Sequence, residues 1–330
     1  MNIAIKLPND VRERVLTFPF LHVLVKKIKE KMDEDQILNL HLISLKDGID
    51  VLNLLPFHAY YHELEAEDLK TIFTMHRACA NFKIYHLDYF ISTTDSFVDA
   101  SIGKNLGAEK KIGYALGKNG WFLNTKIPKL NGRHISEQVF ELLKGVFEEI
   151  PNLSSVYSRN MPAVYADWNE NPYMLINLDL TKDGEVNPEW KDFVDLFTNK
   201  SFVFMCESIP EFEQEEILNG FIKSLPAKNN YKIFVYKSNI EFGKLISYAM
   251  GFVTNDSPLL NIASYCGSQV FLLNKNENLQ VCGPAYSLGE VRNFSVKDPL
   301  YSQGGDFNYA KIFDDLHDFI EKKTKGTEDA

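Results

Sequence analysis

The stretch Phe252-Val253-Thr254-Asn255-Asp256-Ser257-Pro258 leads into Leu259-Leu260-Asn261-Ile262-Ala263-Ser264-Tyr265-Cys266-Gly267 and ends with Ser268-Gln269-Val270-Phe271-Leu272-Leu273. Its apolar first and last segments are typical of strands, and its middle segment is typical of a short helix that stops at glycine. A strand, a turn, a helix and a second strand form one unit of a parallel sheet. The stretch therefore predicts an α/β fold.

The turn before the predicted helix carries the first functional signal. Ser257 is a favoured N-cap, and Pro258 suits the first helical position because its missing N–H would have no intrahelical acceptor there. The pattern predicts that the backbone amides of Leu259 and Leu260 are free at the carboxyl end of a strand. Open α/β sheets bind phosphates at such places. The same residues also fit a helix that is merely well capped, and both interpretations stay open.

Length and composition predict a globular protein of two domains. The chain has 330 residues, which exceeds one ordinary core and predicts two domains of about 150 residues each. Its net charge of −10 argues against a nucleic-acid-binding protein, because phosphate contacts need a basic surface. The four cysteines form no C-x-x-C pair, which indicates reduced thiols rather than disulfides or a zinc site. We found neither a secretory signal nor a run near the roughly 18 apolar residues of a membrane span, so we expect a cytoplasmic location.

Strand and helix patterns alternate along the chain, which predicts parallel sheets with helices on both faces. The alternation breaks between 151 and 172, where Pro, Asn and Ser are frequent. This stretch is the candidate boundary between domains 1–160 and 161–330. Within the first domain we expect a strand at 51–55 and a charged turn at 8–14.

The charged turn follows the first predicted strand and contains four ionisable side chains: Asp10, Arg12, Glu13 and Arg14. A carboxylate at the carboxyl end of a strand can serve as a general base, and an arginine can hold an anion. A solvated loop fits the same residues. If the halves are two Rossmann-like domains that face each other, this turn and the turn at 255–261 border one cleft. That arrangement is the architecture of a GT-B glycosyltransferase.

Other patterns carry less information. The sequence has no G-x-G-x-x-G, no G-x-x-x-x-G-K-[ST] and no G-x-S-x-G motif. His58 and His62 are four residues apart, but Pro56 and the neighbouring tyrosines favour a loop, so we expect no metal site there. A lysine cluster (Lys26, Lys27, Lys29 and Lys31) closes a helix predicted at 15–32. It suits either an anionic membrane surface or the negative end of the helix dipole.

Several strings resemble glycosyltransferase family 9, the lipopolysaccharide heptosyltransferases. Where the family has a strand, S-S-x-G-D, a short apolar stretch and T-x-P, the chain has Lys6-Leu7-Pro8-Asn9-Asp10-Val11-Arg12-Glu13-Arg14-Val15-Leu16-Thr17-Phe18-Pro19. The run from Leu106-Gly107-Ala108 to Lys111-Ile112-Gly113-Tyr114 is similar to the family's L-G-A and R-I-G-F run. Asp256 to Ala263 resembles the D-T-G-x-x-H-x-A donor loop. His134 and Trp190 also stand where the family has comparable residues, so the resemblance covers nearly the whole chain.

The resemblance implies a GT-B fold whose second domain binds a nucleotide-diphospho-sugar, such as ADP-heptose. The first domain would bind a lipid-linked or other glycan acceptor, in the cytoplasm or at the inner face of the cytoplasmic membrane. The implied reaction inverts the sugar without a metal or another cofactor. Counting back from Thr17 assigns Glu13 as the base. The implied donor-binding residues are Asp256, Ser257, Leu259 and Asn261, and the candidates for holding an anion are Arg12 and Lys182.

The chain departs from the family where the family handles phosphate. Arg12 and Pro258 replace glycines, Asn261 replaces a histidine, and Lys182 is no clear match to the family's K-x-W lysine. The alternative is therefore a non-catalytic GT-B homologue that binds a sugar, a nucleotide or a protein partner. A sugar-nucleotide epimerase is a third interpretation, which we disfavour because such clefts usually carry more acidic and histidine residues.

Overall fold

The computed structural model describes residues 1–33, 35–115, 117–153, 173–181, 183–255, 257–275, 279–284 and 291–328. The chain divides into two compact units. The first contains Met1–Asn160 together with the short segment Asn278–Ala285. The second contains Met161–Glu277 together with Tyr286–Ala330. A few residues from the second half of the chain thus pack with the first unit. Most of the stretch expected to form the boundary, 151–172, lies outside the described residues.

The first unit is built on a six-stranded sheet in the order β3-β2-β1-β4-β5-β6, in which every neighbouring pair is parallel. Its strands are β1 (Asn2–Lys6), β2 (Asn39–Leu45), β3 (Tyr60–Leu64), β4 (Tyr89–Ser92), β5 (Lys110–Tyr114) and β6 (Thr125–Ile127). Because the strands are parallel, their carboxyl ends meet at one edge of the sheet. The segments that follow β1, β4, β5 and β6 therefore lie in adjacent positions along that edge.

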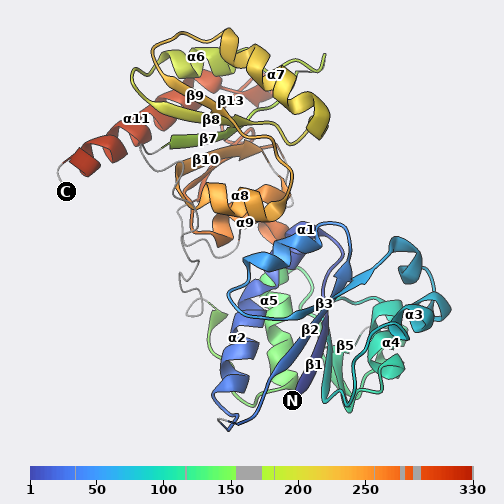
Figure 1. Cartoon of the computed structure of the whole chain (residues 1–330). Helices are drawn as coiled ribbons and strands as arrows, with labels where there is room; N and C mark the ends of the chain where they lie inside the picture. Colours follow the sequence, from blue (N-terminus) through green and yellow to red (C-terminus); the bar gives the residue numbers. More distant parts are fainter. Residues whose placement is uncertain are drawn as a thin grey trace. The chain divides into compact units, whose positions relative to one another are not determined.

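Helices cover both faces of this sheet. Figure 1 shows α2 (Phe18–Lys29) and α5 (Ile135–Phe140) on one face, and α3 (Ile72–Cys79) and α4 (Phe97–Asn105) on the other. The unit also contains α1 (Val11–Leu16), α10 (Leu279–Cys282) and the 3-10 helices η1 (Ile49–Leu54), η2 (Ala66–Leu69), η3 (Gly117–Trp121) and η4 (Glu141–Gly145). A core of buried apolar residues lies between the sheet and α3 and α4, and it includes Ala4, Ile43, Leu64, Met75 and Phe90.

The second unit repeats the plan with a six-stranded parallel sheet in the order β12-β11-β10-β7-β8-β9. Its strands are β7 (Tyr173–Asn177), β8 (Ser201–Met205), β9 (Asn230–Ile233), β10 (Ala249–Asn255), β11 (Val270–Asn274) and β12 (Val291–Ser295). A separate antiparallel pair joins β13 (Ser302–Gln303) and β14 (Asp306–Phe307). The helices are α6 (Glu189–Asp195), α7 (Glu211–Lys223), α8 (Asn239–Ile246), α9 (Pro258–Tyr265) and α11 (Tyr309–Glu328). The predicted α/β class with two Rossmann-like parallel sheets is confirmed.

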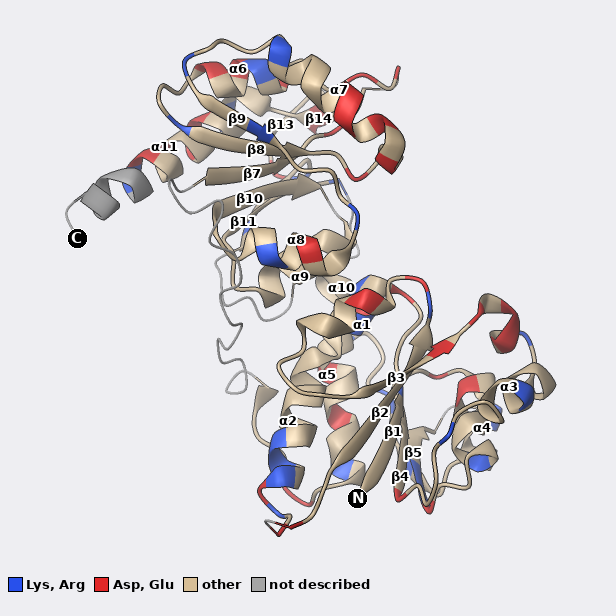
Figure 2. Cartoon of the chain, in the orientation of Figure 1, with Lys and Arg blue, Asp and Glu red and all other residues tan. Residues whose placement is uncertain are grey.

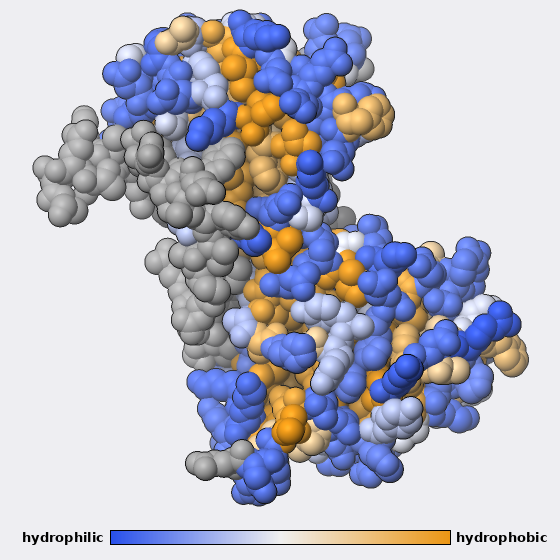
Figure 3. Space-filling view, viewed as in Figure 1, coloured by the Kyte–Doolittle hydropathy of each residue, from blue (hydrophilic) through white to orange (hydrophobic). Residues whose placement is uncertain are grey.

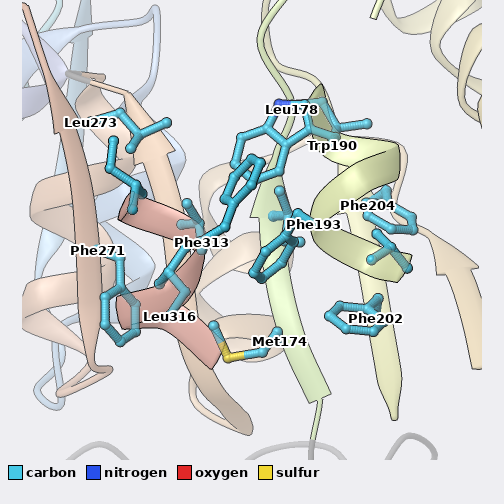
Figure 4. Packing of buried hydrophobic residues seen from close by; sticks show 14 of the residues in the cluster. Met174, Leu178, Trp190, Phe193, Phe202, Phe204, Phe271, Leu273, Phe313 and Leu316 are labelled. Carbon is cyan, nitrogen blue, oxygen red and sulfur yellow. The ribbon is translucent and has the colours of Figure 1, made fainter. Parts of the chain in front are cut away.

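Aromatic side chains dominate the core of the second unit. Figure 4 shows Trp190 and Phe193 of α6 beside Phe313 of α11, against residues of the sheet such as Phe202 and Phe271. The rings of Phe193 and Phe313 lie 4.9 Å apart, centre to centre. Burying an aromatic side chain contributes roughly 1.5–3 kcal/mol. This cluster fixes α6 and α11 on the face of the sheet opposite α8 and α9.

Two local expectations were wrong. The apolar segment at 51–55 belongs to η1 rather than to a strand, because Gly48 turns the chain with a φ of +63° and lets Val51 and Leu52 reach the core from a helical turn. The charged turn at 8–14 becomes helical at Val11, where α1 begins. The left-handed conformation of Gly48 decided the first case, and a tertiary contact decided the second. Neither can be seen in the local periodicity of the sequence.

The histidine that we expected in a loop, His62, lies in β3 instead. Its Nε2 is 2.9 Å from Nδ1 of His41 on the neighbouring strand β2, and the imidazole of His41 stacks on Tyr60. Burial lowers the pKa of both histidines, and in His62 it does so to about 4, with the charge of His41 adding to the effect. One neutral imidazole can donate its N–H to the unprotonated nitrogen of the other. The two histidines therefore form a hydrogen bond in which both rings are neutral. In the described part of the chain, no three metal-binding side chains cluster.

Polar residues predominate on the face shown in Figure 3, where hydrophobic side chains appear in scattered groups. In Figure 2, basic residues gather at the end of α2 and acidic residues along α7.

In the lysine cluster, the ammonium groups of Lys27 and Lys31 lie 5.5 and 5.2 Å from the ring centre of Phe147. Among the described residues, we find no helix with the length and apolarity that crossing a bilayer requires.

Candidate functional site

The turn between β1 and α1 brings charged residues to the carboxyl edge of the first sheet. Asp10 is the N-cap of α1, and its Oδ1 accepts a hydrogen bond from the backbone N–H of Glu13 at 3.2 Å. Glu13 therefore stands in the first turn of the helix, where the helix dipole stabilises a carboxylate. The cap fixes the direction in which α1 leaves the sheet, and with it the place of Glu13.

A buried arginine holds the backbone of this turn through hydrogen bonds. Arg14 is fully buried, and its guanidinium donates to three backbone carbonyl oxygens: that of Pro8 at 3.0 Å, that of Asn9 at 2.6 Å and that of Asp47 at 2.7 Å. The planar fork of arginine suits several acceptors in fixed directions. Of the two interpretations left open for this turn, the solvated loop does not fit Arg14. Arg14 instead holds the backbone that carries Asp10 and Glu13.

Lys6, the last residue of β1, adds a second clamp. Its buried ammonium donates to Oδ1 of Asn9 at 2.8 Å and to the carbonyl of Leu7 at 2.6 Å, and it lies 3.6 Å from a carboxylate oxygen of Asp99. The same oxygen of Asp99 accepts the hydroxyl of Thr94 at 2.6 Å. Burial lowers the pKa of Lys6, and the charge of Asp99 opposes that shift. The turn after β1 is therefore tied to the segment after β4.

The surroundings of Glu13 raise the pKa of its carboxyl group. Burial raises the pKa of its half-buried carboxyl above the ordinary value, and the negative charges of Asp10 and Asp95 raise it further. The positive charges of Lys129 and Arg12 oppose this rise. A carboxylate with a raised pKa accepts a proton more readily than an ordinary glutamate. This property makes Glu13 the candidate proton acceptor among the residues of the turn.

Sequence reasoning missed two members of this edge. Asp95 follows β4 and Lys129 follows β6, and they form an ion pair with an Nζ to Oδ2 distance of 2.6 Å. Both influence the pKa of Glu13. The available signal was positional: each is the charged residue nearest after a strand of the same parallel sheet. The strand order that makes them neighbours could not be read from the local sequence.

The candidate anion-holding residue Arg12 faces the segment that the second half of the chain contributes to this unit. Its Nη1 lies 3.6 Å from Sγ of Cys282, at the end of α10. Nearby, Nδ1 of His134 accepts the N–H of Ser136, so Nε2 carries the proton and donates to the carbonyl of Gly283 at 2.9 Å. His134 thus caps α5 and anchors α10.

The donor-loop turn of the second unit has the cap that its sequence predicts, with a different consequence. Oγ of Ser257 accepts the N–H of Leu259 at 3.1 Å, and its carbonyl accepts the N–H of Leu260 at 3.2 Å. The expectation that both amides are free was therefore wrong, because the cap residue itself takes them. Asn261, one turn into α9, is buried. Asp256 and Lys182 lie outside the described residues.

Polar side chains cross-link the carboxyl edge of the second sheet. Asn177, the last residue of β7, donates from Nδ2 to the hydroxyl of Thr254 on β10 at 3.2 Å, and its Oδ1 accepts the N–H of Glu207. Asp179 accepts the indole N–H of Trp190 at 2.6 Å and the hydroxyl of Tyr309 at 3.1 Å. The hydrogen bond to Asp179 therefore explains the position of Trp190 within the second unit. Asn177 was not singled out from the sequence, although it ends an otherwise apolar strand.

The fold matches solved glycosyltransferase structures over almost its whole length. Heptosyltransferase WaaC of E. coli with ADP superposes with a TM-score of 0.70 at 14% identity, covering 98% of this chain and 99% of that one. The same enzyme with ADP-2-deoxy-2-fluoro heptose gives 0.68 at 13% identity, with 98% and 100% covered. A family 9 glycosyl transferase from Veillonella parvula gives 0.71 at 12% identity, with 97% of each chain covered. The chain therefore has the GT-B fold of these proteins.

The similarity is one of structure. No protein-family model matches the sequence, and a search of curated proteins also returned no match. At 12–14% identity, this chain shares with each of these solved structures its architecture and the order of its elements. Functional assignment must therefore come from the site residues of this chain.

Proposed function

We propose that the protein is an inverting glycosyltransferase that moves a sugar from a nucleotide-diphospho-sugar to a glycan acceptor. The observation that carries the proposal is the carboxylate of Glu13, with its raised pKa, on a turn held by Arg14 at the carboxyl edge of the first sheet of a GT-B fold. The first unit would bind the acceptor and the second unit the donor. Solved structures of the similar WaaC with ADP and with a fluorinated ADP-heptose support an adenosine-diphospho-heptose as donor.

In the proposed reaction, Glu13 takes the proton of an acceptor hydroxyl as the oxygen attacks the anomeric carbon. The bond from that carbon to the diphosphate breaks, and the nucleoside diphosphate leaves from the opposite side, which inverts the carbon. Arg12 and Lys182 are the candidates for balancing the negative charge of the leaving group. Residues 256–261 at the start of α9 would hold the diphosphate, with the dipole of that helix adding to the attraction.

A non-catalytic binding protein remains the second candidate, and one observation favours it. The amides of Leu259 and Leu260 are engaged by Ser257, and Pro258 has no amide, so the start of α9 offers few N–H groups to a phosphate. A nucleotide would then bind through side chains. This candidate predicts binding of a sugar, nucleotide or protein partner without any glycosyl transfer.

A thermal-shift panel of ADP, GDP, UDP and CMP with their sugar conjugates tests donor binding. A ligand at about a hundred times its dissociation constant stabilises the fold by about 2.7 kcal/mol, which appears as a shift of several degrees. We expect one nucleotide to shift the transition, and Asp256→Ala to abolish that shift. The matched control is Asp318→Ala on the exposed side of α11, which should keep it. No shift with any nucleotide would contradict donor binding.

Two carboxylates compete for the role of base, and two variants separate them. Asp10 caps α1 and is exposed, whereas Glu13 is half-buried. We expect Glu13→Gln to lower turnover by about 10²–10⁴ without loss of nucleotide binding. Asp10→Asn should lower it far less, because asparagine is also a good N-cap. The opposite order of effects would transfer the role to Asp10.

We also propose that the protein acts in the cytoplasm, at the inner face of the membrane if its acceptor is linked to lipid. Lys26 and Lys29, exposed at the end of α2, support contact with an anionic surface. Sedimentation with vesicles of phosphatidylglycerol tests this contact, which Lys26→Gln combined with Lys29→Gln should weaken. Equal sedimentation of the variant would contradict a role for these lysines.

A further inference from the structure

One large aromatic side chain stands out at the carboxyl edge of the first sheet. Trp121 ends η3, directly after β5, and 76% of its surface is exposed. Exposing a tryptophan forfeits the stabilisation that its burial would give. Single exposed hydrophobic residues are common on protein surfaces. The case for a function therefore depends on how Trp121 is held and on what surrounds it.

The turn that carries Trp121 is fixed by buried contacts. The side-chain amide of Asn119 is buried and donates to the backbone carbonyl of Asp95. The indole of Trp121 meets the ring of Phe97 edge to face, with centres 6.5 Å apart and planes at 81°. Phe97 also packs on Phe122, at 4.9 Å. One edge of the indole is thus supported while the side chain stays largely open, which is the form of a preorganised binding platform.

The platform follows a strand of the same sheet edge as the proposed base. In the sheet order, β5 is separated from β1 only by β4, so Trp121 and Glu13 follow strands about 10 Å apart. Asp95, after the intervening β4, links them: it accepts the amide of Asn119 and contributes to the pKa of Glu13. A ligand that extends along this edge from Glu13 would reach Trp121.

Lysines are frequent in the sequence around Trp121, in a protein of opposite net charge. Residues 104–133 contain six lysines and one arginine against one glutamate, 7 − 1 = +6, while the whole chain carries −10. The Nζ of Lys104 lies 5.7 Å from the ring centre of Phe122. A side chain at Gly120 would come within 3.3 Å of Nζ of Lys126. Lys118 is exposed within η3 itself. An amphipathic ring with polar or anionic substituents fits an aromatic face among ammonium groups.

We propose that Trp121 is the stacking platform for a sugar ring of the acceptor, and that it determines acceptor specificity. This inference rests on the proposed glycosyltransferase function. A pyranose ring has an apolar face that covers the indole and equatorial hydroxyls that reach Lys118 and Lys126. A protein partner would need a larger continuous apolar patch than one tryptophan beside Lys118 and Lys126 provides.

The test compares Trp121→Ala, Trp121→Phe and the control Phe73→Ala. Phe73 is 87% exposed on α3, a helix that packs on one face of the first sheet. The acceptor probe is a set of core oligosaccharides released from lipopolysaccharide by mild acid. We expect Trp121→Ala to raise the acceptor KM about tenfold with kcat and the donor KM unchanged. Trp121→Phe should recover most of the affinity, and Phe73→Ala should match the wild type. An unchanged acceptor KM in Trp121→Ala would overturn the proposal.

Binding measurements separate this inference from the proposed function. If the wild type transfers no sugar, calorimetric titration with the same oligosaccharides still reports on the platform. Binding that weakens about tenfold in Trp121→Ala and recovers in Trp121→Phe would support a sugar site on a non-catalytic protein. Absence of binding to the wild type, or equal binding to the alanine variant, would overturn the platform whatever the outcome for catalysis.

Discussion

Replacing Arg14 with methionine should destabilise the first unit and disturb the turn that carries Glu13. The substitution keeps a long side chain of similar shape but removes three donors, which leaves the carbonyls of Pro8, Asn9 and Asp47 without their partner. Hydrogen bonds from a charged group contribute about 1.5–3 kcal/mol each. Three at the lower bound give about 4.5 kcal/mol. Removing the buried charge also removes its desolvation cost, so we expect a net loss of about 3 kcal/mol.

Urea unfolding followed by circular dichroism measures this loss. With a slope near 2 kcal/mol per molar, the midpoint of the first transition should fall by about 1.5 M. The control is Arg133→Met, because Arg133 is mostly exposed and lies 3.9 Å from its partner Glu137, a pair that contributes little. Turnover at saturating acceptor should also fall in Arg14→Met under folded conditions. A loss below about 1 kcal/mol would refute the clamp, since the turn would then be held by other contacts.

Three further predictions follow from buried charge and backbone geometry. Because the folded pKa of His62 is near 4 and that of His41 is also lowered, the stabilisation of the neutral pair is complete above pH 6.5. It should be lost toward pH 4, by about 1–2 kcal/mol after allowance for partial exposure, and His62→Gln should flatten that slope in pH-dependent urea titrations. Gly48→Ala places a methyl group against Cγ2 of Val11 at a φ of +63° and should cost about 2–3 kcal/mol of unfolding free energy, whereas Gly107→Ala at +68°, with open space, should cost about 1 kcal/mol. In pH-rate profiles, the acidic limb that reports Glu13 should lie above the ordinary glutamate pKa of 4.5, and a limb at or below that value would contradict its raised pKa.

The sequence was informative where local signals and tertiary structure agree. Ser257 and Pro258 start α9 where their cap pattern predicts. Alternating strands and helices correctly indicated parallel sheets, and the resemblance to heptosyltransferases agrees with the structures that the fold matches. These features depend on short-range rules that a few neighbouring residues satisfy.

Long-range contacts explain what the sequence did not predict. Arg14 reads as a solvated charge, yet it is buried because three carbonyls from two segments converge on it. Asp95 and Lys129 belong to the Glu13 site because of the strand order, which local patterns do not encode. Both of these cases were decided by a partner that lies elsewhere in the fold. The amides of Leu259 and Leu260 are different, because Ser257 takes them locally, as an N-cap residue does.

The most direct test of the central claim is release of nucleoside diphosphate from a panel of nucleotide sugars, with core oligosaccharides as acceptors and wild type beside Glu13→Gln. We expect release from one donor by the wild type, with an inverted anomeric product in the oligosaccharide. Glu13→Gln should lower the rate of release by about 10²–10⁴, with thermal stabilisation by the same nucleotide retained. Release at the wild-type rate by Glu13→Gln, or no release from any donor, would contradict the claim that Glu13 is the base of a glycosyltransferase.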